Sequence, residues 1–290
     1  MRGESMSKVR IVVDSTSDLP PETRGRLGIE MVPLKVHFGN VSFQDSVTIT
    51  SEQFFERLSV EKELPTTSQP SPAEFVEVYK KLLQDPDTAV ISIHLSSAMS
   101  GTYQSAELAK SMLDEPGRVT VVDSRSASLG IGLLAIAAAE AAQEGLDAEG
   151  CMERLRRAQQ SMKLYFLVDT LEFLRRNGRI GKASALLGSL LNIKPILSID
   201  QEGAIFPVDK VRGSRKAMNR IVELLQADFG GGEVRVTLVH ANAPEAAQAL
   251  SDAAEQGLNT RETAVYALGP VIGTHVGPGT LGVFVLPTAL

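Results

Sequence analysis

The sequence predicts a two-domain α/β protein whose domains differ in the kind of sheet they contain. In the first part of the chain, short β-branched segments alternate with helical patterns, which is typical of parallel βαβ units. From about Lys163 onward, six strand-like segments occur, and residues 194–200 and 204–209 are joined by a short glycine-containing turn that is typical of a hairpin. We therefore expect a mainly parallel domain over residues 1–162 and a mixed α/β domain of about six strands over 163–290.

Apolar periodicity and helix-start signals locate the elements of the N-terminal domain. Ser71-Pro72 marks the clearest helix start, because Glu74, three residues after Ser71, completes a capping box. The apolar run 129–142 contains Glu140 and is shorter than the roughly 20 residues that a membrane span needs, so we expect a buried helix there. The predicted strands cover 9–13, 31–38, 89–95 and 118–122, and the predicted helices cover 51–59, 72–84, 101–113, 127–143 and 147–160.

The C-terminal domain is assigned in the same way. Its six predicted strands cover 163–168, 194–199, 204–209, 233–240, 261–268 and 280–286. Its predicted helices cover 171–176, 183–191, 214–227 and 244–255. Residues 269–280 are so rich in glycine and proline that we expect a loop between the last two strands.

Composition excludes several classes of protein. The chain has 290 residues, is 43% hydrophobic and carries a formal net charge of -6 without a long basic run, which argues against a general nucleic-acid surface. Cys151 is the single cysteine, so an internal disulfide and a cysteine-cluster metal site are excluded, and we expect a reducing cytoplasm. No signal peptide is visible, and no paired histidines have the spacing of metal ligands.

Three strand–helix junctions are dense in hydroxyl side chains: residues 14–18, 66–68 and 96–102. Because ligands of open α/β sheets collect at the carboxyl ends of the strands, we expect the first and third junctions at the same sheet edge. Ser100-Gly101 begins a helix whose free amides favour an anion, and Gly101 would let that anion approach the backbone closely. Helix capping explains an isolated serine at least as well, and the two interpretations are compatible.

The histidines and the basic turns supply further candidates. His275 lies among turn residues that fix its backbone, which favours a functional site. Arg179 and Arg212 each stand beside a glycine, where they can meet phosphate or an acidic partner, although a charged run is usually a solvated face. The other three histidines occur in strand patterns that favour structural roles: His37, His94 and His240.

Taken together, these motifs resemble the DegV family. The resemblance is carried, in order, by DSTSDLP, TSQPSPAEF, SSAMSGTYQSA, the Asn-Gly-Arg-Ile turn, KVRG and THVGPGTLG, and it covers about residues 9–288. One departure is that the turn usually written Gly-Gly-Arg reads Asn177-Gly178-Arg179 here. Asparagine tolerates left-handed backbone geometry nearly as glycine does, so the departure changes little.

The resemblance implies the fatty-acid-binding subunit of a bacterial fatty acid kinase. Such a protein has two α/β domains with the lipid site between them, no catalytic residues, no metal and no cofactor. It would present the carboxylate of a long-chain fatty acid to an ATP-dependent kinase partner, which makes acyl phosphate for phospholipid synthesis. No nucleic acid and no stable membrane insertion are expected.

The resemblance also assigns roles to individual residues. Thr67, His275 and a serine of the SSAMSGT block would bind the carboxylate, with Ser100 favoured and Ser97 next. Arg179 and Arg212 would serve phosphoryl transfer or docking.

Two alternatives belong to other classes. A serine-dependent lipid or acyl hydrolase could use Ser100 and His275 with Asp14, but no GxSxG motif marks the nucleophile. A phosphate- or nucleotide-binding regulator could use the basic turns, but the phosphate loop GxxxxGK[ST] is absent. The sequence leaves open the chain length and unsaturation of the lipid, the residues around its tail and the oligomeric state.

Overall fold

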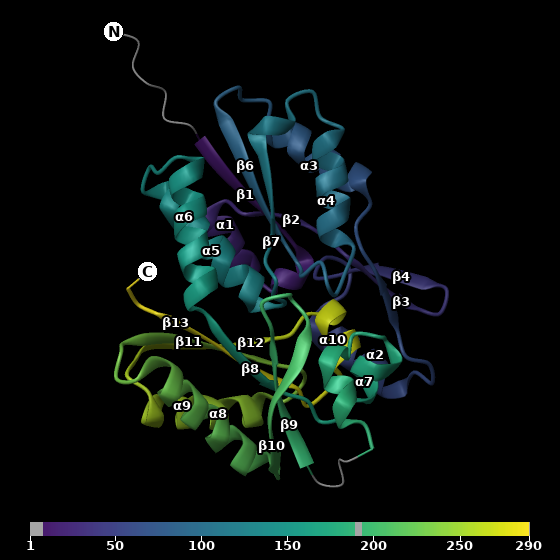
Figure 1. Ribbon diagram of the computed structural model, residues 1–290. Helices are drawn as coiled ribbons and strands as arrows, with labels where there is room; N and C mark the ends of the chain where they lie inside the picture. The colour runs from purple at the N-terminus through teal and green to yellow at the C-terminus, as the bar shows by residue number, and fades with distance from the viewer. Residues whose placement is uncertain (1–7, 189–192, 290) are drawn as a thin grey trace. The chain divides into compact units, whose positions relative to one another are not determined.

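The computed structural model describes residues 8–188 and 193–289, which fall into two compact units (Figure 1). The first unit comprises the residues up to Lys35 together with Ser68–Gln160. The second comprises Val36–Thr67 together with the residues from Ser161 onward. The predicted domains are each continuous along the chain, whereas the observed units are interleaved because the segment Val36–Thr67 packs with the C-terminal part.

The first unit contains a parallel four-stranded sheet in the order β2-β1-β6-β7. Its strands are β2 (Glu30–Val32), β1 (Lys8–Asp14), β6 (Thr88–His94) and β7 (Val119–Asp123). The inner strands β1 and β6 are almost wholly buried, as parallel strands covered on both faces are. The predicted parallel sheet is therefore confirmed.

Helices cover both faces of this sheet. Phe75 and Tyr79 of α3 (Pro72–Leu82) and Ala106 of α4 (Thr102–Ser111) pack in one buried cluster with Val12 and Val90 of the sheet. On the other side in Figure 1 lie α1 (Pro21–Leu27), α5 (Leu129–Gln143) and α6 (Ala148–Ser161). The predicted buried apolar helix is α5. The predicted capping box at Ser71 is also present, because the Glu74 amide donates to Ser71 Oγ and the Ser71 amide donates to the Glu74 carboxylate.

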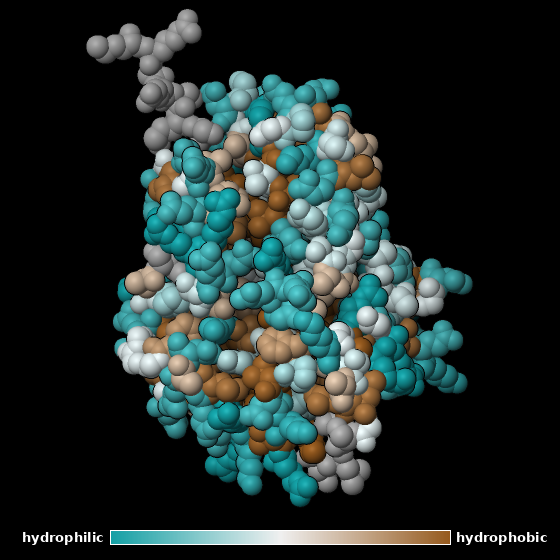
Figure 2. All heavy atoms as spheres, in the orientation of Figure 1, coloured by the Kyte–Doolittle hydropathy of each residue, from teal (hydrophilic) through white to brown (hydrophobic). Residues whose placement is uncertain are grey.

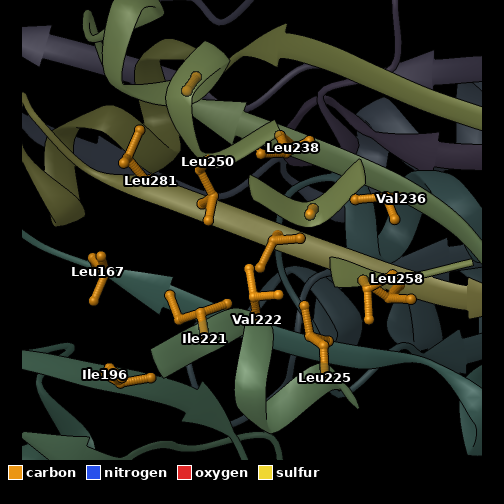
Figure 3. Packing of buried hydrophobic residues seen from close by; sticks show 14 of the residues in the cluster. Leu167, Ile196, Ile221, Val222, Leu225, Val236, Leu238, Leu250, Leu258 and Leu281 are labelled. Atoms are coloured by element: carbon orange, nitrogen blue, oxygen red, sulfur yellow. The ribbon is translucent and has the colours of Figure 1, made fainter. Parts of the chain in front are cut away.

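The second unit contains a six-stranded mixed sheet in the order β10-β9-β8-β13-β11-β12. Its strands are β8 (Lys163–Leu167), β9 (Ile193–Ile199), β10 (Ile205–Arg212), β11 (Val234–His240), β12 (Thr260–Ala267) and β13 (Leu281–Pro287). All six predicted strands are confirmed, and β9 and β10 form the predicted antiparallel hairpin. Side chains of α8 (Ser214–Phe229) and α9 (Pro244–Gly257) pack on this sheet in one buried cluster (Figure 3).

A smaller part of the second unit contains three short helices and a three-stranded sheet, of which only the end residues Lys35 and Ser68 belong to the first unit. The sheet has the order β4-β3-β5 and is formed by β4 (Val41–Gln44), β3 (Lys35–Phe38) and β5 (Thr66–Ser68). The helices are α2 (Ser51–Val60), α7 (Glu172–Arg176) and α10 (Pro270–Val276). Helix α10 contacts both α2 and α7.

Four features differ from the sequence prediction. The predicted strand 31–38 is two strands in different sheets, because Pro33, which has no amide proton, interrupts it. The predicted helix 183–191 is a 3-10 helix over Gly181–Leu186, and residues 189–191 lie outside the described part. The predicted loop 269–280 contains α10, which starts at Pro270, a favoured first helical residue. The short elements α1, β4 and β5 were not predicted.

The surface in Figure 2 is mostly hydrophilic, with hydrophobic residues visible in groups between the polar ones. Within residues 8–188 and 193–289, no helix combines the length and apolar character that crossing a membrane requires. The same residues contain no group of three or more histidine, cysteine, aspartate or glutamate side chains arranged to hold a metal ion.

Candidate functional site

The carboxyl ends of β1, β6 and β7 bring three polar loops together in the first unit. Their pairing is in register, with Val13 opposite Ile93 and His94 opposite Asp123. The Ser96 amide donates to the carbonyl of Ser126, 3.0 Å away, so the loops after β6 and β7 are in contact. The expectation that the first and third hydroxyl-rich junctions share a sheet edge is confirmed.

Asp14 is the hydrogen-bond centre of this edge. The side chain is fully buried, and its Oδ1 accepts from the amide of Thr16 at 3.0 Å and from the hydroxyl of the same residue. Its Oδ2 accepts from the Leu95 amide at 3.0 Å and pairs with His94 Nδ1 at 3.1 Å. One buried carboxylate therefore ties the turn after β1 to the loop after β6.

A buried chain of polar side chains extends from Asp14 into the sheet. The Tyr79 hydroxyl donates to Ser92 Oγ at 2.8 Å, and Ser92 Oγ lies 2.6 Å from His94 Nε2. Because Ser92 accepts from Tyr79, its own proton is available for His94 Nε2, which leaves the Nδ1 proton of His94 for Asp14. Every member of the chain is thereby satisfied, and His94 has the structural role that its strand position predicts.

The serines of the loop after β6 differ in what their hydroxyls do. Ser97 Oγ donates to Asp123 Oδ2 at 2.5 Å, and the Ser97 amide donates to Oδ1 of the same carboxylate. Ser100 Oγ accepts from the Thr102 amide at 3.3 Å and lies 2.9 Å from Thr102 Oγ1. When Thr102 donates in that pair, the Ser100 proton remains available, whereas the Ser97 proton is held by a carboxylate.

The space in front of Gly101 is filled by the end of a side chain from another segment. Helix α4 begins at Thr102 with Gly101 as its N-cap, but a Cβ added at Gly101 would lie 2.6 Å from Nε2 of Gln69. The side chain of Gln69 therefore occupies the space in front of this glycine. Gly101 lets the Gln69 side chain pack closely against the SSAMSGT loop, a contact between distant segments that the sequence does not reveal.

A second polar pair lies in the second unit, where Thr67 meets His275. Thr67 is the central residue of β5, and its Oγ1 lies 2.8 Å from His275 Nε2. Because strand side chains alternate between faces, Thr66 and Ser68 point away from the face that Thr67 occupies. Two residues separated by 208 positions in the chain are thus directly hydrogen-bonded.

Helix α10 places His275, and its neighbours hold it tightly. A Cβ added at Gly273 would lie 2.9 Å from the rings of Phe54 and Phe55 in α2. The Asn177 side-chain amide donates to the carbonyl of Thr274 at 3.0 Å. Besides ending α7, Asn177 therefore makes a side-chain hydrogen bond that a glycine at this position of the turn cannot make.

His275 is a neutral imidazole with one unpaired nitrogen. Burial, and secondarily the positive charge of Arg179, lowers the pKa of His275 from its ordinary 6.5 to about 4. Its Nδ1 is buried and has no hydrogen-bond partner among the described residues. Since buried polar atoms are nearly always paired, a water molecule or a ligand has to supply the partner of this nitrogen.

The lowered pKa of His275 predicts a loss of stability in acid. Between pH 6.5 and about 4 the unfolded chain binds a proton at this residue that the folded protein does not, so this contribution to stability is present above pH 6.5 and lost as the pH falls. We expect the urea midpoint to fall between pH 7 and pH 5, and to fall less in His275→Gln. Equal falls in the two proteins would contradict the assignment.

The predicted basic residues are exposed in the second unit. Glu172 pairs with both Arg175 and Arg176, which lowers the pKa of Glu172 to about 2. Arg179 instead donates from Nη1 to the carbonyl of Asn177 at 2.7 Å, and its charge is close enough to lower the pKa of His275. Arg212 is exposed at the end of β10.

Comparison with known proteins decides the family. A family model described as "Uncharacterised protein, DegV family" matches residues 8–288. The chain belongs to the DegV family. A DegV domain-containing protein of Deinococcus radiodurans is 41% identical over 282 residues, which cover 96% of this chain and 98% of the relative.

Solved DegV structures share the whole fold. A DegV family protein from Thermus thermophilus, whose structure is described as showing fatty acid binding, superposes with a TM-score of 0.91 at 41% identity, covering 97% of this chain and 99% of the other. DegV of Bacillus subtilis, described as a fatty acid binding protein, superposes with a TM-score of 0.86 at 37% identity, covering 97% and 100%. The predicted family and fold class of this DegV protein are therefore confirmed.

Proposed function

We propose that this DegV protein binds a long-chain fatty acid and presents its carboxylate to an ATP-dependent fatty acid kinase. Thr67 and His275 would bind the carboxylate, and Ser100 would donate a further hydrogen bond to it. The observation that carries the proposal is the Thr67–His275 pair, in which the buried Nδ1 of His275 has no hydrogen-bond partner among the described residues. Fatty acid binding by the related structures supports the choice of ligand.

Proton accounting explains why this pair suits a carboxylate. Neutral Thr67 and His275 have two exchangeable protons between them, and one is used in the 2.8 Å bond that joins them. If His275 carries its proton on Nδ1, that proton faces the ligand. If the proton is on Nε2, it is donated to Thr67, and the Thr67 hydroxyl faces the ligand. Either tautomer offers one donor to a carboxylate oxygen.

The tail and the head of the ligand would contribute differently. Burial of an acyl chain yields on the order of 0.8 kcal/mol per methylene, so about fourteen methylenes give roughly 11 kcal/mol before the costs of association. A carboxylate that leaves water must regain its hydrogen bonds, and the hydroxyls of Thr67 and Ser100 are suitable donors. The tail would supply affinity, and the head group would fix the orientation.

The geometry around His275 does not favour the hydrolase alternative. A general base works best with a pKa near the operating pH, whereas the pKa of His275 is lowered to about 4. A catalytic triad also needs a third group that orients Nδ1, and the described residues offer Nδ1 no partner. Asp14, which the alternative with Ser100 and His275 would use as this third group, is paired with His94 instead.

Neutral donors also suit the kinase step of the proposal. Hydroxyls and a neutral imidazole hold a carboxylate without satisfying all of its lone pairs, which leaves an oxygen able to attack the γ-phosphorus of ATP and displace ADP. A bidentate arginine would hold it more firmly. The exposed Arg179 and Arg212 would contact the kinase partner or the transferring phosphoryl group. If Thr67→Arg kept both lipid binding and kinase turnover, this explanation of the neutral site would be wrong.

Lipid extraction tests the binding function directly. Protein purified from a bacterial host should release about one long-chain fatty acid per chain into an organic solvent, measured by mass spectrometry. Absence of stoichiometric lipid, with no uptake of added palmitate, would refute the proposal. Turnover of simple esters with labelling of Ser100 by a fluorophosphonate would support the hydrolase instead.

The kinase function needs a separate assay. The lipid-loaded protein, ATP and a bacterial fatty acid kinase should form acyl phosphate together, and omission of either protein should abolish it. Binding of ATP by this protein alone in a titration would contradict the carrier role and favour a nucleotide-binding regulator.

A matched pair of serine variants tests the head-group contacts. Ser100→Ala should weaken fatty acid binding about tenfold or more, because a hydrogen bond to a charged group is lost. Ser97→Ala should change the affinity less than about threefold, because its proton is already held by Asp123. Titration of a fluorescent fatty acid measures both, and a larger effect at Ser97 would reverse the assignment.

A further inference from the structure

The hydroxyl of Ser17 is the second buried polar atom without a partner in the described chain. Ser17 ends the 3-10 turn Ser15–Ser17 that follows β1, and it is 1% exposed. Within residues 8–188 and 193–289, only its Oγ and His275 Nδ1 are buried side-chain polar atoms that lack a hydrogen-bond partner.

The neighbours of Ser17 in the same motif are all engaged. Ser15 Oγ accepts from the Leu34 amide at 3.0 Å, and the Thr16 hydroxyl donates to Asp14. Asp18 accepts from the Ser128 hydroxyl at 2.5 Å. Ser17 is thus an exception within a fully hydrogen-bonded turn.

An unpaired buried hydroxyl lowers the stability of a protein, whereas an alanine in the same place would not. The backbone of this turn packs directly against α5, which restricts its movement. A Cβ added at Gly132 of α5 would lie 2.8 Å from the Ser17 carbonyl oxygen. The destabilising group is therefore held in place, which is expected of a residue that meets a ligand.

The position of the turn indicates which part of a ligand Ser17 would meet. Asp14 accepts hydrogen bonds from both the Ser15–Ser17 turn and the Leu95 amide. Leu95 begins the loop that contains Ser100, so one carboxylate fixes both hydroxyl-bearing segments at the same sheet edge. Ser17 and Ser100 therefore stand on two segments that Asp14 fixes at this edge.

We propose that Ser17 is a further ligand-binding residue, whose hydroxyl donates to a carboxylate oxygen of the bound fatty acid. This inference rests on the proposed function and adds a donor that neither the family resemblance nor the Thr67–His275 pair supplies. It also makes a distinctive prediction. The Ser17 hydroxyl should lower the stability of the free protein and raise its affinity for the fatty acid.

The test uses the delipidated full chain and two serine variants. Ser17→Ala should weaken palmitate binding about tenfold, and it should raise the thermal midpoint of the free protein by about 2–4 °C because the unpaired hydroxyl is gone. Ser15→Ala is the matched control, since it removes a hydroxyl that accepts from Leu34. That variant should lower the midpoint and leave the affinity within about twofold.

Hexadecanol distinguishes the head group from the tail. If Ser17 contacts the carboxylate, Ser17→Ala should weaken palmitate binding more than hexadecanol binding, because hydrogen bonds to a charged acceptor are stronger. Unchanged palmitate affinity, equal losses for the two lipids, or a lowered midpoint would each overturn the inference. Failure of the unmutated protein to bind palmitate would instead refute the proposed function.

Discussion

Replacing Asp14 with alanine should lower the free energy of unfolding by about 3–5 kcal/mol. The reason is the number of donors that lose their acceptor in a site closed to water: the Thr16 amide and hydroxyl, the Leu95 amide and the His94 ring. Each buried donor left unpaired costs about 1–3 kcal/mol. Urea unfolding at pH 7, followed by circular dichroism, measures the loss.

Asp123→Ala is the matched control for this prediction. Asp123 also ends a strand of the same sheet, and it accepts from the Ser97 amide, the Ser97 hydroxyl and the Arg125 amide. It is half-buried, so water can replace it, and we expect a loss of only about 1 kcal/mol. Equal losses in the free energy of unfolding for the two variants would show that the contribution of Asp14 to stability does not depend on its burial.

Asp14→Ala should also weaken fatty acid binding beyond its effect on stability. The loop that carries Ser100 starts at the Leu95 amide, which Asp14 holds. At a temperature where the variant remains folded, its affinity for palmitate should fall, and Asp14→Asn, which keeps one acceptor oxygen, should restore part of it. No recovery in the asparagine variant would favour a purely electrostatic role.

Local patterns were sufficient to predict the fold class and most elements. Buried strands such as β1 and β6 are rich in β-branched apolar residues, and Ser71 with Glu74 marks a helix start by a local hydrogen-bond pattern. The failures occurred where distant contacts outweigh local preference. Helix α10 forms in a glycine-rich segment because α2 and α7 pack against its glycines, and those contacts leave no periodic trace in the sequence.

The candidate site was predictable in its residue types but less so in their partners. The position of hydroxyls after parallel strands correctly placed the loops after β1 and β6 at one edge. The sequence could not predict that the Ser97 hydroxyl donates to Asp123. Nor could it predict that the Ser17 hydroxyl lacks a partner among the described residues, because both depend on three-dimensional contacts. The one available signal for Asp14 was its position directly after a buried strand, where a carboxylate must find several donors.

Gly277→Ala should lower the free energy of unfolding by about 3–5 kcal/mol, through backbone strain and steric overlap acting together. Gly277 ends α10 with φ 76° and ψ 170°, a conformation that is essentially restricted to glycine. A Cβ there would lie 2.3 Å from the ring of Phe173, far inside van der Waals contact. Because the helix that ends here carries His275, fatty acid binding should be lost as well.

Two further variants separate the causes of that loss. Gly178→Ala imposes a positive φ of 70° on alanine with no atom within 4 Å of the new Cβ, so it should cost only about 1–2 kcal/mol. In a Phe173→Ala background, Gly277→Ala should be less harmful than alone, since the overlap is removed and the backbone strain remains. If Gly277→Ala cost as much in the Phe173→Ala background as in the unmutated protein, steric overlap would contribute nothing. In that case His275 would keep its place, and the Gly277→Ala variant should still bind palmitate.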